Sequence, residues 1–247
     1  MKLQLPQVTL IAVTSVKIYE TIRALTYSMQ GIDFGEVVLV THKKPFGLPK
    51  GITYKHTDRL TDIDRFNYLI AYELGSYVNT DYVILVHYDG FIVHPEMWRK
   101  EFLAYDYIGS PWPLPTAEHS TYYDANGNIC RVGNSVSLRS RRFLNYPKEA
   151  GFEWKPAADG FYNEDIFLCC MNKVKFEEAG MRFAPIEVAR LFGREHTIPE
   201  TEGVTPFLFH KWWGENRDFP KFENPLTKLW LTIKAIRRRL MFWRDWS

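Results

Sequence analysis

The strongest constraint on the fold is the alternation of continuous apolar runs with segments of helical periodicity through residues 1–90. The apolar runs are residues 8–14, 36–41 and 81–86, and the helical segments are residues 18–29 and 63–78. Strands that are apolar throughout are typical of parallel sheets covered by helices on both faces. The sequence therefore predicts an α/β fold with a mostly parallel central sheet, a further short strand at 53–56, and Asp62 as the cap of the second helix.

After residue 90 the pattern loosens into segments rich in Pro, Trp and Gly, which indicates shorter strands and loops. With 46% hydrophobic residues in a chain of 247, we expect residues 1–223 to form a single domain with halves at 1–90 and 91–223. This body carries 25 basic and 28 acidic residues, whereas residues 224–247 carry six basic residues and one acid. A net charge of −3 on the body argues against nucleic acid as a partner.

Polar residues follow the apolar strands, at the edge where parallel sheets bind ligands. Thr14 and Ser15 end the first strand, and the turn 87–90 follows the strand at 81–86. No glycine-rich phosphate loop follows the first strand, so a nucleotide must be held in another way. Asp89, in the turn, can hold a divalent cation that bridges two phosphates. The alternative is a turn Asp that satisfies local backbone amides.

Three later segments carry side chains that suit a sugar or nucleotide ligand. They are residues 131–140 with Gly133 and Asn134, residues 160–168 with Glu164 and Asp165, and residues 205–213 with His210. A glycine lets the backbone approach a polyhydroxyl ligand closely. Two adjacent acids at a helix start can simply favour the positive end of the helix.

The order of these motifs resembles that of GT-A-type glycosyltransferases. It is most similar to a bacterial group of glycosyltransferase-like proteins described only as a domain of unknown function, and the similarity spans residues 8–213. In the superfamily, an Asp-x-Asp motif at the end of a central strand binds manganese and the sugar diphosphate. Its last acid corresponds to Asp89, whereas His87 stands where the first acid would be.

The resemblance implies a metal-dependent enzyme that moves a sugar from a nucleotide-sugar donor, UDP-linked, to a hydroxyl of a surface polysaccharide or lipid-linked glycan, with inversion. Mn²⁺ or Mg²⁺ would be held by Asp89 and His210, although a core histidine is the alternative for His210. His87 would ligate the metal or bond the ribose. Asp165 would be the general base, with Glu164 in contact with the acceptor or the donor sugar.

Further contacts follow from the same resemblance. The donor contacts are Thr14 and Ser15 at the base, Arg65 and Asn67 at the diphosphate and base, Tyr88 in the turn before Asp89, and Gly133 and Asn134 at the donor sugar. A salt bridge from Arg65 to Asp62 is the alternative for that arginine. Trp112, in the acceptor-binding half 91–223, is expected to stack on a sugar face.

Two other functions fit the same sequence. One is a non-catalytic carbohydrate-binding protein in which His87 marks a degraded metal site. The other is a retaining transferase on the same scaffold.

The location is predicted from what the sequence lacks and from its last segment. Three cysteines without zinc-type spacing, and no recognisable signal or transmembrane run, favour a reducing, cytoplasmic location. Residues 224–247 place Leu, Ile and Trp on one helical face and Lys and Arg on the others, which is typical of a helix lying in a membrane interface. We therefore expect peripheral attachment to the inner face of the cell membrane; a helix docked on the body is the alternative.

This expectation can be tested by liposome flotation. The full chain should float with anionic vesicles, and a chain without residues 224–247 should not, because apolar burial and attraction to anionic lipid both come from this segment. Equal recovery of the two proteins with the vesicles would contradict it.

Overall fold

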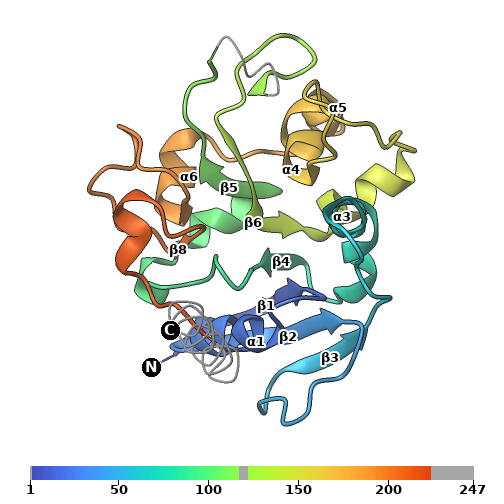
Figure 1. Cartoon of the computed structure of the whole chain (residues 1–247). Helices are drawn as coiled ribbons and strands as arrows, with labels where there is room; N and C mark the ends of the chain where they lie inside the picture. The colour runs from blue at the N-terminus through green and yellow to red at the C-terminus, as the bar shows by residue number, and fades with distance from the viewer. Residues whose placement is uncertain (1, 117–121, 224–247) are drawn as a thin grey trace, which may run out of the picture.

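A six-stranded sheet of order β3-β2-β1-β4-β6-β5 forms the centre of the computed structural model, which describes residues 2–116 and 122–223 (Figure 1). The strands are β1 (Leu3–Val13), β2 (Ile32–Thr41), β3 (Thr53–His56), β4 (Tyr82–Leu85), β5 (Tyr107–Pro111) and β6 (Val132–Ser140). The pairs among β1 to β4 are parallel, and β6 runs antiparallel to both β4 and β5. The prediction of a mostly parallel α/β sheet is confirmed.

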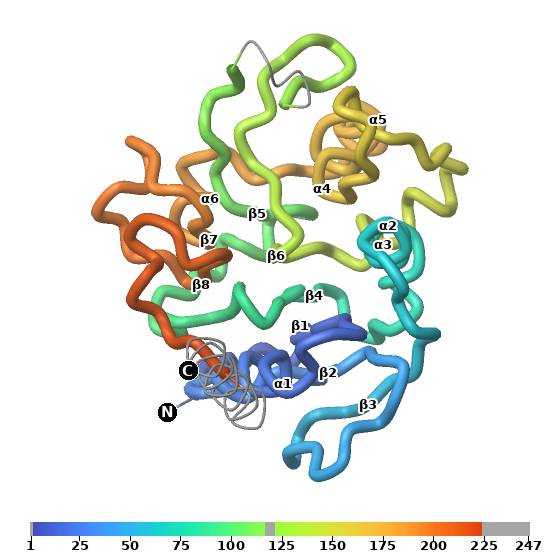
Figure 2. Tube along the Cα trace, viewed as in Figure 1, coloured from blue at the N-terminus to red at the C-terminus, as the bar shows by residue number. Residues whose placement is uncertain are grey.

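Helices follow the strands and cover the sheet, as the tube along the chain shows (Figure 2). They are α1 (Ile18–Ser28), α2 (Ile63–Tyr68), α3 (Arg141–Glu149), α4 (Glu164–Ile166), α5 (Lys173–Glu178) and α6 (Ile186–Phe192). A second sheet, of β7 (Gly193–Arg194) and β8 (Leu208–Phe209), is parallel and has two strands.

Alternate side chains of β1 belong to two different hydrophobic clusters. Leu10 of β1 packs in a cluster with Leu25 of α1. The next residue, Ile11, packs in a separate cluster with Leu69, which follows α2, and Leu144 of α3. Since successive side chains of a strand point to opposite faces, helices cover both faces of the sheet, and this explains why its central strands are apolar throughout.

The helix expected over residues 63–78 is broken into three pieces. It begins at α2, continues as a π-helical turn Leu69–Glu73 and ends as a 3₁₀ turn Leu74–Tyr77. Asp62 caps it as predicted, because its Oδ1 accepts a hydrogen bond from the backbone N of Arg65 at 2.8 Å.

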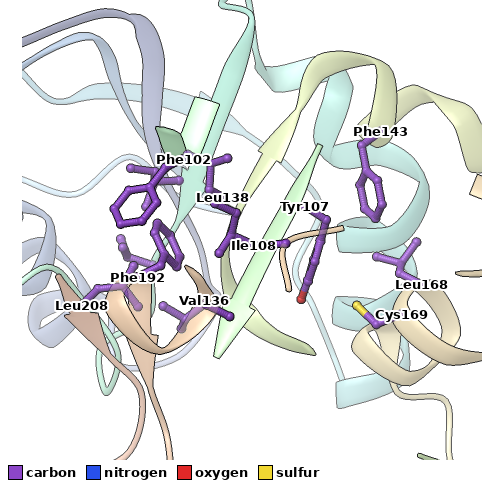
Figure 3. Close-up of a cluster of buried hydrophobic side chains, with 14 of the residues drawn as sticks. Phe102, Tyr107, Ile108, Val136, Leu138, Phe143, Leu168, Cys169, Phe192 and Leu208 are labelled. Atoms are coloured by element: carbon purple, nitrogen blue, oxygen red, sulfur yellow. The ribbon is translucent and has the colours of Figure 1, made fainter. Parts of the chain in front are cut away.

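The second half of the chain packs around β5 and β6. Figure 3 shows side chains of these two strands between one group that includes Phe102 and Phe192 and another that includes Phe143. All nine residues of β6 are buried, and among them are polar ones such as Asn134 and Arg139. Buried polar groups require hydrogen-bond partners, so β6 is where polar chemistry is built into the core.

No helix within residues 2–116 and 122–223 combines the length and the apolar character needed to cross a bilayer. The amphipathic helix expected at 224–247 lies outside the described residues and stays a prediction.

The β1–β2 ladder contains an irregularity that depends on one glycine. The pairing runs regularly up to Leu5 and Phe34 and then shifts, resuming at Thr9 and Glu36. Pro6 has no N–H to donate to a ladder, and a Cβ on Gly35 would lie 2.1 Å from the Pro6 carbonyl oxygen. Only a residue without a side chain fits opposite this proline.

We expect Gly35→Ala to lower the free energy of unfolding by about 3 kcal/mol, because the methyl group would force β1 and β2 apart. Gly47→Ala is the control: Gly47 has a left-handed φ of +65° but no atom within 4 Å of the added Cβ, so it should cost only about 1 kcal/mol. Urea denaturation measures both values, and equal losses would show that the close approach at Gly35 is not tight.

Candidate functional site

A cavity of about 540 Å³ opens at the carboxyl ends of β1 and β4. Its wall is formed by residues 13–16, by residues 60–67 other than 64 and 65, by residues 87–89, 163–165 and 210–211, and by Thr21 and Ser135. The first and third stretches follow β1 and β4 directly, which is where parallel sheets present ligand-binding loops.

Nine of the predicted site residues line this cavity: Thr14, Ser15, Asn67, His87, Tyr88, Asp89, Glu164, Asp165 and His210. Four do not: Arg65, Trp112, Gly133 and Asn134.

His87, Asp89 and His210 form a group that could hold a metal ion, because one potential ligand atom from each lies within 4.8 Å of the others. The buried Nε2 of His210 makes no hydrogen bond and lies 3.9 Å from Oδ1 of Asp89. Burial, assisted by the neighbouring His210, lowers the pKa of His87 to about 3. His87 is therefore neutral, the form in which imidazole binds metals. Two imidazoles and one carboxylate suit Mn²⁺ better than Mg²⁺.

The missing side chain of Gly90 lets this group assemble. A Cβ at this position would lie 2.8 Å from Cδ2 of His210 and 2.7 Å from Cγ2 of Val136. The backbone N of Lys211 donates to the carbonyl of Asp89 at 2.7 Å. The end of β8 can therefore lie directly against the turn after β4.

Lys211 is a site residue that the sequence analysis did not identify. Its Nζ lies 2.7 Å from Oδ2 of Asp89. Burial raises the pKa of Asp89, but His210 and the Lys211 ammonium outweigh that effect and hold this pKa below its usual value. Asp89 is thus ionised and paired with a cation that belongs to the chain. The only sequence signal was its place next to His210.

Glu195, after β7, is a second residue that was missed. Its Oε2 accepts a hydrogen bond from Nδ2 of Asn134 at 2.7 Å, and its Oε1 lies 3.2 Å from Nδ1 of His210. Burial raises the pKa of Glu195, but the neighbouring His210, His196 and Lys211 outweigh that effect and hold this pKa below its usual value. A lone acid after a two-residue strand has no pattern that the sequence could reveal.

The structure does not bring Gly133, Asn134 and Trp112, the predicted sugar contacts, to the cavity wall. A Cβ on Gly133 would lie 2.0 Å from the Trp112 ring, so this glycine makes room for the indole. Trp112 is only 3% exposed and belongs to the core, which leaves no ring face for a sugar. Asn134 has a φ of 137° and directs its side-chain amide to Glu195 rather than into the cavity.

Arg65 and Asn67 lie differently relative to the cavity. The Arg65 guanidinium pairs with Glu73 at 2.8 Å and lies outside the cavity wall, so the alternative salt bridge to Asp62 is not formed. Asn67 is buried at the cavity and donates from Nδ2 to the carbonyl of Tyr162.

Glu164 and Asp165 have different environments although they are adjacent. Glu164 pairs at 3.4 Å with Arg139, whose side chain is fully buried. Asp165 lies partly buried in the cavity wall, and its Oδ1 accepts a hydrogen bond from the backbone N of Ile166. Burial raises the pKa of Asp165 to about 8, and the charges of Glu164 and Glu195 contribute to the rise. The pair therefore offers one fixed anion and one group that exchanges a proton near neutral pH.

Comparison with known proteins places the chain in a family. Residues 54–210 match the model described as "Protein of unknown function (DUF5672)". The chain belongs to this family. A search of curated proteins gave no match.

Two solved structures resemble the whole fold. The galactosyltransferase LgtC in complex with donor and acceptor sugar analogs is 12% identical, with a TM-score of 0.51 over 84% of this chain and 87% of that one. An active-site mutant of LgtC is 11% identical, with a TM-score of 0.50 over 86% and 92%. This member of the DUF5672 family therefore has the GT-A fold, as the order of its sequence motifs predicted.

We expect Arg139→Met to lower the free energy of unfolding by about 3 to 5 kcal/mol, because Glu164 would remain charged and buried without its partner. Lys173→Met removes an exposed i,i+4 pair with Glu177 and should cost about 0.5 kcal/mol or less. Chemical denaturation of both variants makes the comparison. Similar losses would mean that the buried pair contributes no more than a surface one.

Proposed function

We propose that this protein is a glycosyltransferase that moves a sugar from a UDP-linked donor to a hydroxyl of a surface polysaccharide or lipid-linked glycan. The observation that carries the proposal is the meeting of the His87, Asp89 and His210 group with Asp165 in one cavity. The GT-A fold, and a structural neighbour whose title names donor and acceptor sugar analogs, support it.

In this proposal the nucleoside lies along Thr14, Ser15 and Asn67, and the diphosphate lies at the metal group. His87, Asp89 and His210 would hold Mn²⁺, which stabilises negative charge on a departing diphosphate when it is bound. Lys211 adds a second positive charge at the same place, because its Nζ already contacts Asp89. A preorganised cation at a developing charge is among the strongest catalytic effects available to a protein.

Asp165 is the general base of the proposal. The acceptor hydroxyl loses its proton as its oxygen attacks the anomeric carbon, and the leaving group departs from the opposite face with inversion. A pKa of about 8 keeps the Asp165 carboxylate basic enough to take that proton. Glu164, held by Arg139, keeps a negative charge beside Asp165 and so contributes to this pKa, instead of contacting a sugar.

Attachment at the inner face of the cell membrane, through residues 224–247, belongs to the same proposal. It rests on the sequence of that segment and on a lipid-linked acceptor, which would lie in the same interface.

The test is the variant Asp165→Asn, assayed for Mn²⁺-dependent donor hydrolysis and transfer. The rate should fall by about 10² to 10⁴-fold, since the amide cannot accept the proton. Donor binding, read as the rise in thermal stability on addition of nucleotide sugars, should persist. The wild-type kcat/KM should rise with pH up to about 8 and then level off, because the ionised form of Asp165 is the active one. Asp58→Asn changes an exposed acid outside the cavity wall and is the matched control.

Two outcomes would replace the proposal. Donor binding without any turnover by the wild-type protein would favour the non-catalytic carbohydrate-binding function. A product that keeps the anomeric configuration of the donor, seen by proton NMR, would favour a retaining transferase.

A further inference from the structure

The backbone places Glu195 and His210 side by side at the ends of two short parallel strands. Arg194 of β7 pairs with Phe209 of β8, so the next residue of each strand follows in register. The backbone N of His210 also donates to the carbonyl of Arg194 at 2.9 Å. The two side chains therefore start from adjacent, hydrogen-bonded positions.

A single buried side chain clamps both strand ends. Nδ2 of Asn216, which is fully buried, lies within 3.4 Å of the carbonyl oxygens of Arg194, Glu195, His210 and Lys211. Its Oδ1 accepts from Nε of Arg194 at 2.8 Å. The backbone that carries Glu195 and His210 is thus held on both sides by one amide group.

The two oxygens of Glu195 have separate partners. Oε2 accepts from Asn134 at 2.7 Å, and Asn134 is itself held because its Oδ1 accepts from the backbone N of Val136 at 2.9 Å. This fixes the carboxylate and leaves Oε1 at 3.2 Å from Nδ1 of His210.

The two nitrogens of His210 therefore face different groups. Nδ1 lies 3.2 Å from Oε1 of Glu195 and Nε2 lies 3.9 Å from Oδ1 of Asp89, and neither buried nitrogen has another hydrogen-bond partner among the described residues. A carboxylate can only accept, so the imidazole that turns Nδ1 to Glu195 carries its hydrogen there and keeps the lone pair of Nε2 free. Carboxylates placed in this way are a common outer partner of metal-binding histidines.

We propose that Glu195 is the positioning residue of the metal site: it orients His210 and selects the tautomer whose Nε2 can bind the ion. The inference rests on the metal group of the proposed function. Asn134 takes part indirectly, because it holds the carboxylate of Glu195. This role accounts for a buried asparagine with a strained backbone in β6.

The test is Glu195→Gln, which keeps the size of the side chain. The side-chain oxygen of the glutamine can still accept from Asn134, but its NH₂ group then donates to Nδ1 of His210. The ring hydrogen therefore moves to Nε2, where it blocks metal binding. Mn²⁺ affinity of the protein without nucleotide, measured by electron paramagnetic resonance, should fall about 10 to 100-fold. Glu202→Gln, at an exposed acid of the following loop, is the matched control and should keep wild-type affinity.

The tautomer supplies a readout that a merely structural role would not change. Long-range ¹H–¹⁵N spectra of the metal-free protein should show His210 protonated at Nδ1 in the wild type and at Nε2 in Glu195→Gln. In a His210→Ala background, Glu195→Gln should cause no further loss of Mn²⁺ affinity, because its effect passes through that ring.

Three results would overturn the inference: wild-type Mn²⁺ affinity in Glu195→Gln, a full additional loss in the His210→Ala background, or a wild-type His210 protonated at Nε2. The last needs no variant and decides the matter if Glu195→Gln does not fold. A failure of the proposed function looks different. If the proposed function fails, Asp89→Asn leaves Mn²⁺ binding unchanged, whereas the tautomer of His210 still changes when Glu195 is replaced.

Discussion

The site depends on one backbone contact, the hydrogen bond from N of Lys211 to the carbonyl of Asp89. It joins the turn after β4 to the end of β8 across more than a hundred residues of sequence, and it brings His210 and Lys211 to Asp89. Gly90 makes the contact feasible, since any side chain there would strike the His210 ring. The small sheet β7–β8 exists at this place because its strand ends are held between the turn and Asn216.

Most of the acids around the cavity have a compensating group. Asp89 pairs with Lys211, Glu164 pairs with Arg139, and Glu195 has Asn134 and His210. Asp165 forms no ion pair within the described part of the chain, and its pKa is the one that burial and neighbouring charge raise to about 8. Among these four acids, Asp165 is therefore the one that exchanges a proton near neutral pH, and such a difference between neighbouring carboxyl groups is what acid–base chemistry requires.

The sequence predicted the sheet and half of the site because strand ends carry a strong signal. An apolar run followed by His87, Tyr88 and Asp89 places those residues at the ligand edge of a parallel sheet whatever the details are. Gly133 misled for a physical reason: a glycine that makes room for an indole and one that makes room for a ligand look the same in sequence. Glu195 was missed since a two-residue strand has no periodicity, and its partner lies 15 positions further along the chain.

Replacement of an acid by His87 changes the charge of the site as well as its ligands. A neutral imidazole stands where a carboxylate would contribute a negative charge, and Lys211 adds a positive one, so the metal group is more positive than a two-acid site would be. The pKa of His87, about 3, means that this charge stays constant over the physiological range. In a body with more acids than bases, such a positive spot favours the binding of an anion. In the proposed transferase, an anionic donor would be attracted both by Lys211 and by a bound divalent ion, so donor and metal would strengthen each other's binding, and this coupling is reciprocal.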